Sequence, residues 1–243
     1  MANETFVAFL LDRTGSMQSI AEETIGAFNA YIASLQEGDG KITFSLSLFD
    51  SPGMYGELAG LCLERVHVNK PVKEVDPLTH QTYQPRGYTP LIDAAYKTIK
   101  DASKATKGTD AKVVICIQTD GQENASKKHT WEQLNALIKR KTAKGWQFNF
   151  MGAGIDAYAQ GRRMGLNDGQ TMSYDSGDRI STVSAFSAQA HNTRLYASGS
   201  LADTNYTSAQ KKMSGDKFVP KGAATSKSAG AKKASGTVRA AVS

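Results

Sequence analysis

The sequence predicts an α/β fold in which a mostly parallel sheet is flanked by helices, and three observations point to it. Apolar runs of strand length alternate with amphipathic helical patterns, which is the order expected when parallel strands are joined by helical crossovers. Residues 5–11 form a continuous apolar run, as expected of a central strand that is covered on both faces. The length of 243 residues suits one such domain with an extension.

The individual elements can be placed from this pattern. The strands are expected at residues 5–11, 42–49, 61–68, 112–118, 146–151 and 170–174. The helices, in which apolar side chains recur every three or four residues, are expected at residues 17–35, 89–102, 130–144, 156–164 and 180–195. A short Gly-rich loop joins the second and third strands, which predicts an antiparallel hairpin at the sheet edge. Thr89 and Thr130 are expected to cap the helices that follow them, Thr130 in a capping box with Gln133.

The formal net charge of +6 comes from the C-terminal part of the chain. From residue 200 onward only two acidic residues oppose the basic ones, which are Lys211, Lys212, Lys217, Lys221, Lys227, Lys232, Lys233 and Arg239. This segment is rich in Ala, Ser, Gly, Lys and Thr, so we expect a domain over residues 1–198 and a basic, disordered tail over residues 199–243. The tail is either a solubilising spacer or a contact for nucleic acid or an acidic partner. It has almost no aromatic residues for base stacking, so sequence-specific recognition of nucleic acid is not expected.

The expected environment is the cytoplasm. No apolar run approaches the roughly 18 residues of a membrane span, and the N-terminus lacks the features of a secretory signal. Cys62 and Cys116 lie in apolar strand-like runs, so we expect them to be buried free thiols in a reducing compartment. No oligomer interface is legible, and we expect a monomer.

Three segments place oxygen-bearing side chains at the end of a strand or the start of a helix, and they are residues 12–16, 86–90 and 119–121. In an open α/β sheet, ligands bind outside the carboxyl ends of the strands, so these side chains are expected to converge there. The candidate donors are two carboxylates and three hydroxyls, namely Asp12, Thr14, Ser16, Thr89 and Asp120. Such hard donors suit Mg²⁺, with Mn²⁺ as an alternative, and the absence of a placed His or Cys argues against zinc.

These segments resemble the von Willebrand factor A (vWA) domain with its metal-ion-dependent adhesion site. That family carries Asp-x-Ser-x-Ser after the first strand, a Thr at a helix start and an Asp before Gly after the fourth strand. The sequence matches at Asp12, Ser16, Thr89 and Asp120, while Thr14 stands where Ser is usual. The resemblance covers roughly residues 4–198 and implies a doubly wound, Rossmann-like, six-stranded sheet with one antiparallel edge strand. The sequence is similar to bacterial and phage intracellular members of the family at residues 11–17, 25–29 and 83–87.

The resemblance also implies roles for the residues. Thr14 and Ser16 would ligate the metal through their hydroxyls, and Thr89 directly or through water. Asp12 and Asp120 would hold coordinated waters, or one of them would bind directly. The open metal position would take a Glu or Asp of a protein partner, which makes the chain a binding module and not an enzyme. Taken alone, each of these residues could also serve as a helix cap or a turn residue. The alternative to a metal site is a degenerate site that binds no metal.

Other side chains are expected near the metal face as partner contacts, namely Arg13, Asp50, Arg86, Gln122 and Glu123. Two alternative functions stay open. A Mg²⁺-dependent phosphohydrolase could use Asp12 as its nucleophile, although Thr14 stands where such enzymes carry a second carboxylate and no Lys is evident around Asp120. A nucleic-acid-associated accessory protein would act through the basic tail.

Overall fold

The predicted sheet is confirmed in a computed structural model, which describes residues 4–54, 57–58 and 60–220. Its strands run in the order β5-β2-β1-β6-β7-β8. Their bounds are β1 Thr5–Asp12, β2 Ile42–Asp50, β5 Cys62–Pro71, β6 Lys112–Thr119, β7 Gln147–Ala153 and β8 Thr171–Tyr174. All neighbours pair in parallel except β5, which lies antiparallel to β2 at one edge. Two short strands, β3 Gly53–Met54 and β4 Glu57–Leu58, form a small hairpin in the β2–β5 connection.

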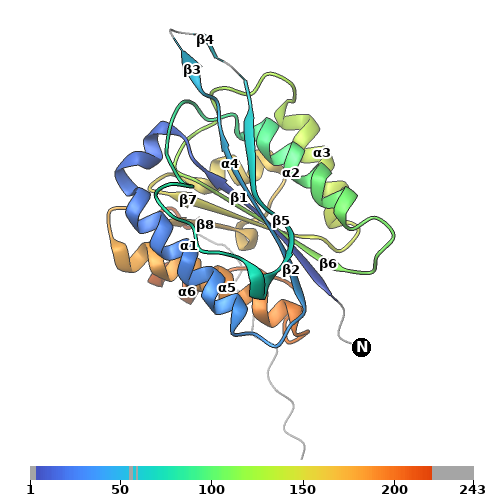
Figure 1. The fold of residues 1–243 in the computed structure, drawn as a ribbon. Helices are drawn as coiled ribbons and strands as arrows, with labels where there is room; N and C mark the ends of the chain where they lie inside the picture. Colours follow the sequence, from blue (N-terminus) through green and yellow to red (C-terminus); the bar gives the residue numbers. More distant parts are fainter. Residues whose placement is uncertain (1–3, 55–56, 59, 221–243) are drawn as a thin grey trace, which may run out of the picture.

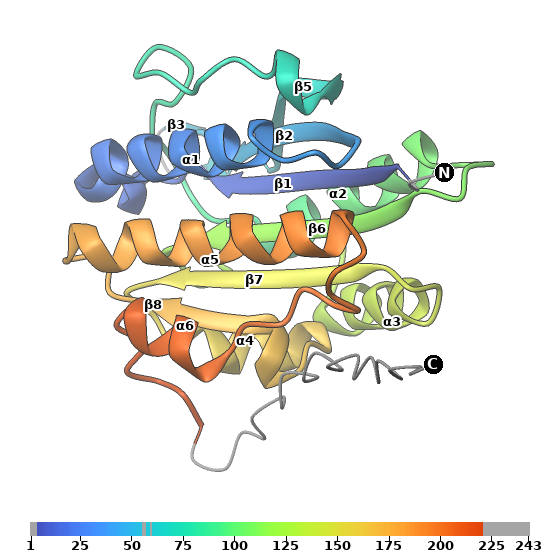
Figure 2. The same ribbon diagram turned by 90° about the horizontal axis from the view of Figure 1, so that it is seen from below.

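Helices cover both faces of the sheet, as Figures 1 and 2 show. One layer contains α1 Ala21–Gln36, α5 Arg179–Ala197 and α6 Ser208–Met213, and the other contains α2 Leu91–Ala105, α3 Trp131–Thr142 and α4 Ala157–Met164. Short 3₁₀ segments, η1 Gly15–Ile20, η2 Val72–Glu74 and η3 Asp168–Gln170, join some of the elements. Strand order reverses between β1 and β6, and open α/β sheets generally bind ligands outside the carboxyl ends of the strands at such a point.

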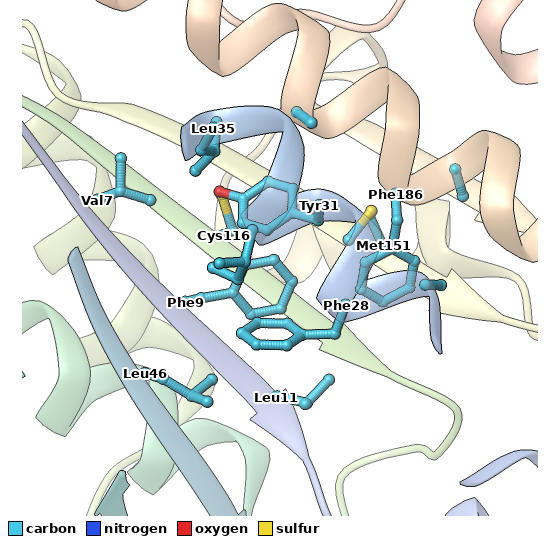
Figure 3. Close-up of a cluster of buried hydrophobic side chains, with 14 of the residues drawn as sticks. Val7, Phe9, Leu11, Phe28, Tyr31, Leu35, Leu46, Cys116, Met151 and Phe186 are labelled. Carbon is cyan, nitrogen blue, oxygen red and sulfur yellow. The ribbon is translucent and has the colours of Figure 1, made fainter. Parts of the chain in front are cut away.

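The continuous apolar run in β1 supplies both cores. Phe9 belongs to the core under α1 and α5, whereas Leu10 belongs to the core under α2 and α3. Phe9 makes edge-on contacts with Phe28 and Tyr31 at centroid distances of 5.4 and 5.2 Å, and it stacks on Phe186 at 6.1 Å (Figure 3). These aromatic contacts fix α1 and α5 over the same strand, so the carboxyl end of β1 is held from both sides.

The expectation of a disordered tail from residue 199 is wrong as far as residue 220. Tyr206 is 3 % exposed, and its hydroxyl donates to the Gln189 side chain on α5. The buried Lys211 donates to a backbone carbonyl and lies 4.9 Å from the centroid of the Tyr158 ring. Asp216 accepts hydrogen bonds from the Tyr158 hydroxyl at 2.6 Å and from a backbone amide of β8 at 3.0 Å. The segment thus buries few apolar groups but satisfies many polar ones, a balance that composition does not reveal. Residues 221–243 lie outside the described residues.

The two predicted helix caps turn out differently. Thr130 caps α3 in the expected capping box, accepting from the Gln133 amide at 3.4 Å while Gln133 accepts from the Thr130 amide at 3.0 Å. At α2 the cap position belongs to Pro90, which offers no side-chain acceptor, and Thr89 does not cap the helix. The N-terminus of α2 therefore needs acceptors from elsewhere in the chain.

Both cysteines in the described chain are free thiols, as expected. Cys116 is buried, whereas Cys62 is only partly buried. Within the described residues, the helices are too short or too polar for any of them to traverse a bilayer.

The packing of the C-terminal segment can be tested with one buried and one exposed aromatic residue. Tyr206→Ala removes a buried ring, so we expect the free energy of unfolding to fall by about 3–5 kcal/mol. Phe218→Ala is the matched control, because Phe218 is half exposed, and should cost less than about 1 kcal/mol. Urea unfolding followed by circular dichroism measures both. Equal effects would contradict the packing described here.

Candidate metal centre

The three oxygen-bearing segments meet at the carboxyl edge of the sheet. Leu11 pairs with Gln118 in the parallel β1–β6 ladder, so the loops that follow the two strands start side by side. The Ser16 hydroxyl donates to Oδ1 of Asp120 at 2.7 Å, although 104 residues separate them. The Thr14 and Ser16 hydroxyl oxygens lie 3.3 Å apart. The predicted convergence of these residues is therefore present in the structure.

Thr89 reaches the same point from the start of α2. A Cβ atom placed on Gly121, the residue after Asp120, would lie 2.9 Å from the Thr89 hydroxyl oxygen. The missing side chain of Gly121 thus allows Thr89 to approach the loop that carries Asp120. Thr14, Ser16 and Asp120 are thus in contact, Asp12 is linked to them through the Thr14 amide, and Thr89 lies against the residue after Asp120. Metal binding by these five residues stays a prediction.

Asp12 is the buried base of this site. Its Oδ1 accepts from the Thr14 amide at 2.6 Å, and its Oδ2 accepts from the Thr119 hydroxyl. Burial raises the pKa of Asp12 to about 7, against a lowering effect of the hydrogen bonds from Thr119 and Thr14, and the nearby Asp120 carboxylate raises it further. Burial also raises the pKa of Asp120. Two carboxylates in this setting are stabilised either by a proton or by a cation.

The spacing of the donors fits a small divalent cation. Neighbouring ligands of an octahedral Mg²⁺ at about 2.0–2.1 Å from the metal lie about 2.9 Å from each other. The oxygen distances of 2.7 Å from Ser16 to Asp120 and 3.3 Å from Ser16 to Thr14 bracket this value. Ser16 is exposed and Asp120 is half-buried, so the site opens to solvent on their side. Zinc suits the site poorly, because hydroxyls dominate the donor set.

The expectation that Arg13 and Asp50 contact a partner is corrected, because both side chains are buried in an ion-pair network. Arg13 is 4 % exposed and donates from Nε to Asp50 at 2.8 Å, and it also pairs with Glu64. Asp50 is fully buried and receives a second ion pair from Nε of Arg86 at 3.1 Å. The side chain of Arg86 remains 52 % exposed, and Gln122 is exposed, so these two predicted contacts are still available at the surface.

The expectation for Glu123 is corrected as well. Its carboxylate accepts backbone hydrogen bonds from Ile92, Ala125 and Ser126 at 2.8, 2.9 and 2.7 Å, and a further one from the Ser126 hydroxyl at 2.7 Å. With its acceptor capacity used inside the protein, Glu123 is a poor contact for a partner.

Several contacts that support the site were not predicted from the sequence. The buried Tyr83 hydroxyl donates to the carbonyl of Asp12 at 2.5 Å. The Gly15 amide donates to the Gly87 carbonyl at 3.1 Å, and the Arg86 amide to the Arg13 carbonyl at 2.9 Å. The loop containing residues 83–87 therefore braces residues 12–15 from outside the sheet. In the sequence, residues 83–87 stood out through their similarity to bacterial and phage vWA domains, which does not show this bracing role.

Comparisons with known proteins establish the fold but no closer relationship. No protein-family model matches the sequence, and no curated protein matches it. A von Willebrand factor type A structure from Catenulispora acidiphila matches with a TM-score of 0.53 and 13 % identity, over 79 % of this chain and 43 % of that one. The manganese-loaded TRAP protein of Plasmodium vivax matches with a TM-score of 0.52 and 17 % identity, over 76 % and 74 %. The pilus adhesin SpaC of Lactobacillus rhamnosus GG matches with a TM-score of 0.55 and 14 % identity, over 80 % and 30 %.

These likenesses show that the chain has the fold of vWA domains. Identities of 13–17 % show the fold alone, so the roles of individual residues rest on the geometry of this chain. The chain also spans less than half of several of these proteins, such as 46 % of the mussel byssus proximal thread matrix protein 1.

The raised pKa of Asp12 predicts opposite pH dependences with and without a cation. In chelator, the folded chain holds a proton on Asp12 up to about pH 7, whereas the unfolded chain releases it near its ordinary value of 3.8. Stability from this group is therefore fully present below about pH 4 and is lost as the pH rises to about 7. A bound cation displaces the proton, so apparent Mg²⁺ affinity should fall roughly tenfold between about pH 8 and pH 6.

Thermal melts in chelator and calorimetric titrations with Mg²⁺ measure the two trends. Asp12→Asn is the control, because it cannot titrate and should lack this part of the slope in chelator. A Mg²⁺ affinity that stays constant from about pH 6 to pH 8 would contradict the assignment of Asp12 to the site.

Proposed function

We propose that this chain is a protein-binding module that depends on Mg²⁺, or on Mn²⁺, and captures an acidic side chain of a partner. The observation that carries the proposal is the meeting of Ser16 and Asp120 at 2.7 Å, with Thr14 and Thr89 beside them, at an opening of the surface. The vWA fold supports it, since the matching TRAP structure is manganese-loaded. When bound, the cation supplies a Lewis-acidic position that accepts a carboxylate oxygen.

Each residue has a definite task in this proposal. Thr14, Ser16 and Thr89 offer hydroxyl oxygens, which carry no full charge and leave the cation electron-poor. Asp120 faces the opening, and Asp12 balances charge from beneath while it fixes the Thr14 amide. A donor set of this kind favours an anionic ligand from outside, which a Glu or Asp of a partner provides.

The buried state of Asp12 favours binding without chemistry. A phosphohydrolase would need Asp12 to attack the substrate, but this side chain is fully buried and both of its oxygens accept hydrogen bonds. Thr14 stands where the general acid would be needed. We therefore propose that the chain is not an enzyme.

The partner would be a protein, with Arg86 and Gln122 beside its acidic residue. The nucleic-acid alternative loses part of its support, because two cations of the basic segment are engaged in the fold. Lys211 is buried against Tyr158, and Lys217 pairs with Asp175 at 2.6 Å. A contact with nucleic acid would rest on the remaining basic residues and would be non-specific.

The proposal predicts a metal-dependent complex that fails when the site is altered. Asp12→Ala and Ser16→Ala should each weaken Mn²⁺ binding by about 10- to 100-fold in calorimetry. Asp110→Ala is the matched control and should bind like the wild type, because Asp110 is exposed and lies before β6, at the opposite edge of the sheet. Absence of Mg²⁺ and Mn²⁺ uptake by the wild type would overturn the proposal.

The partner side can be tested by affinity capture in Mg²⁺ and in chelator. A genuine partner should be retained only by the wild type with Mg²⁺, and exchange of its contact Glu or Asp for the amide should abolish retention. A complex that survives chelation and the Asp12→Ala change would show that the metal does not bridge the two proteins.

A further inference from the structure

We infer that residues 123–126, here called the trans cap, are positioning residues that hold Thr89 against the loop carrying Asp120. The inference rests on the proposed function, because the site it positions is the candidate metal centre. It also gives Glu123 a role that replaces its expected contact with a partner.

The first step concerns the N-terminus of α2, where the cap residue makes no side-chain hydrogen bond to the helix. The cap residue Pro90 has no side-chain acceptor, so the first backbone amides of the helix require acceptors from another segment. Glu123 accepts from the Ile92 amide at 2.8 Å, and the Ser126 hydroxyl accepts from the Asp93 amide at 3.0 Å. A carboxylate at this end also faces the positive pole of the helix dipole, which strengthens the contact.

The second step concerns Thr89 itself. The Thr89 amide donates to Oδ1 of Asn124 at 2.8 Å, and the Asn124 amide donates to the Thr89 carbonyl at 3.1 Å. This reciprocal pair ties the backbone of Thr89 to a residue that lies four positions after Asp120. The Thr89 hydroxyl then lies against Gly121, where a Cβ atom would come within 2.9 Å.

The third step is that α2 holds the same loop in return. Asp93, in the first turn of α2, is 2 % exposed and accepts from the amides of Lys127, Lys128 and His129 at 2.8, 3.0 and 2.9 Å. The His129 ring contacts the same carboxylate at 2.8 Å and stacks on Tyr96 of α2 at 3.8 Å. Each segment therefore satisfies backbone groups of the other.

This mutual capping has a consequence for the site. Asp12 ends β1 and Asp120 directly follows β6, and because these two strands are hydrogen-bonded to each other, the sheet fixes the separation of the two residues. Thr89 arrives with a helix that packs on the sheet through apolar side chains, and apolar packing has no direction. Backbone hydrogen bonds between Tyr88 and Ser51 hold the preceding residue to the end of β2. The bonds of the trans cap add the direct tie between Thr89 and the loop that carries Asp120.

The test compares the trans cap with a cap that has no part in the site. Glu123→Ala and Asn124→Ala remove the acceptors for Ile92 and Thr89, and Glu123→Gln keeps one of the two carboxylate acceptors. Thr130→Ala is the matched control, because it removes the cap of α3 without touching Thr89. Mn²⁺ affinity is measured by calorimetry on the full chain well below its melting temperature, and hydrogen exchange of the α2 N-terminus is followed in chelator.

We expect Glu123→Ala and Asn124→Ala to weaken Mn²⁺ binding by about 10- to 100-fold, with Glu123→Gln in between. In chelator, the backbone amides of residues 89–93 should exchange faster in both alanine variants than in the wild type. This measurement tests the trans cap in the absence of metal. Thr130→Ala should lower the melting temperature and leave Mn²⁺ affinity unchanged. The inference is overturned if the trans-cap variants bind as tightly as wild type, or if Thr130→Ala weakens binding equally. Absence of Mn²⁺ uptake by the wild type itself would instead overturn the proposed function and this inference together.

Discussion

The parallel pairing of β1 with β6 is the constraint on which the site depends. Each strand is buried over almost its whole length, and each ends in an acidic residue or leads directly to one. The ladder brings Asp12 and Asp120 to the same edge of the sheet, where burial raises the pKa of both. A sheet that buries two acids together must supply donors or a cation to satisfy them. The Thr14 amide and the hydroxyls of Ser16 and Thr119 are the donors that this chain supplies.

The loops around the site are fixed by polar contacts that the sheet cannot provide. Arg13, which alternates with Asp12 and Thr14, points away from the site into the ion pairs with Asp50 and Glu64. Arg86 adds to the same network from the loop that braces residues 12–15. The alternation of side chains in residues 12–14 thus separates two functions, since Asp12 and Thr14 face the site while Arg13 anchors the loop.

The sequence predicted the structure correctly where the signal for an element lies within a few neighbouring residues. The apolar run of β1 predicted a central strand, and Thr130 with Gln133 predicted a capping box, because both signals are complete within a few positions. The five donors could be grouped because parallel strands bring their carboxyl ends together. Thr89 as a cap and Glu123 as a partner contact were wrong, since their partners lie about 30 residues away in sequence. No local pattern shows which of two distant segments caps the other.

The prediction for residues 199–220 was wrong for a related reason. The contacts of these residues also explain how α5 is held in place. Two of the apolar side chains that predicted this helix, Ile180 and Val183, are exposed. The helix lies over the core through Phe186 and over buried polar groups through Gln189 and Asn192. Gln189 contacts Asn149 of β7 at 3.4 Å, and the Asn192 amide group donates to the carbonyl of Asn205 at 3.0 Å. If α5 slid along its axis, these buried hydrogen bonds would break and their donors would remain unsatisfied, which would lower the free energy of unfolding. Residues 199–220 are therefore part of the domain in a physical sense, since they fix the register of its last long helix.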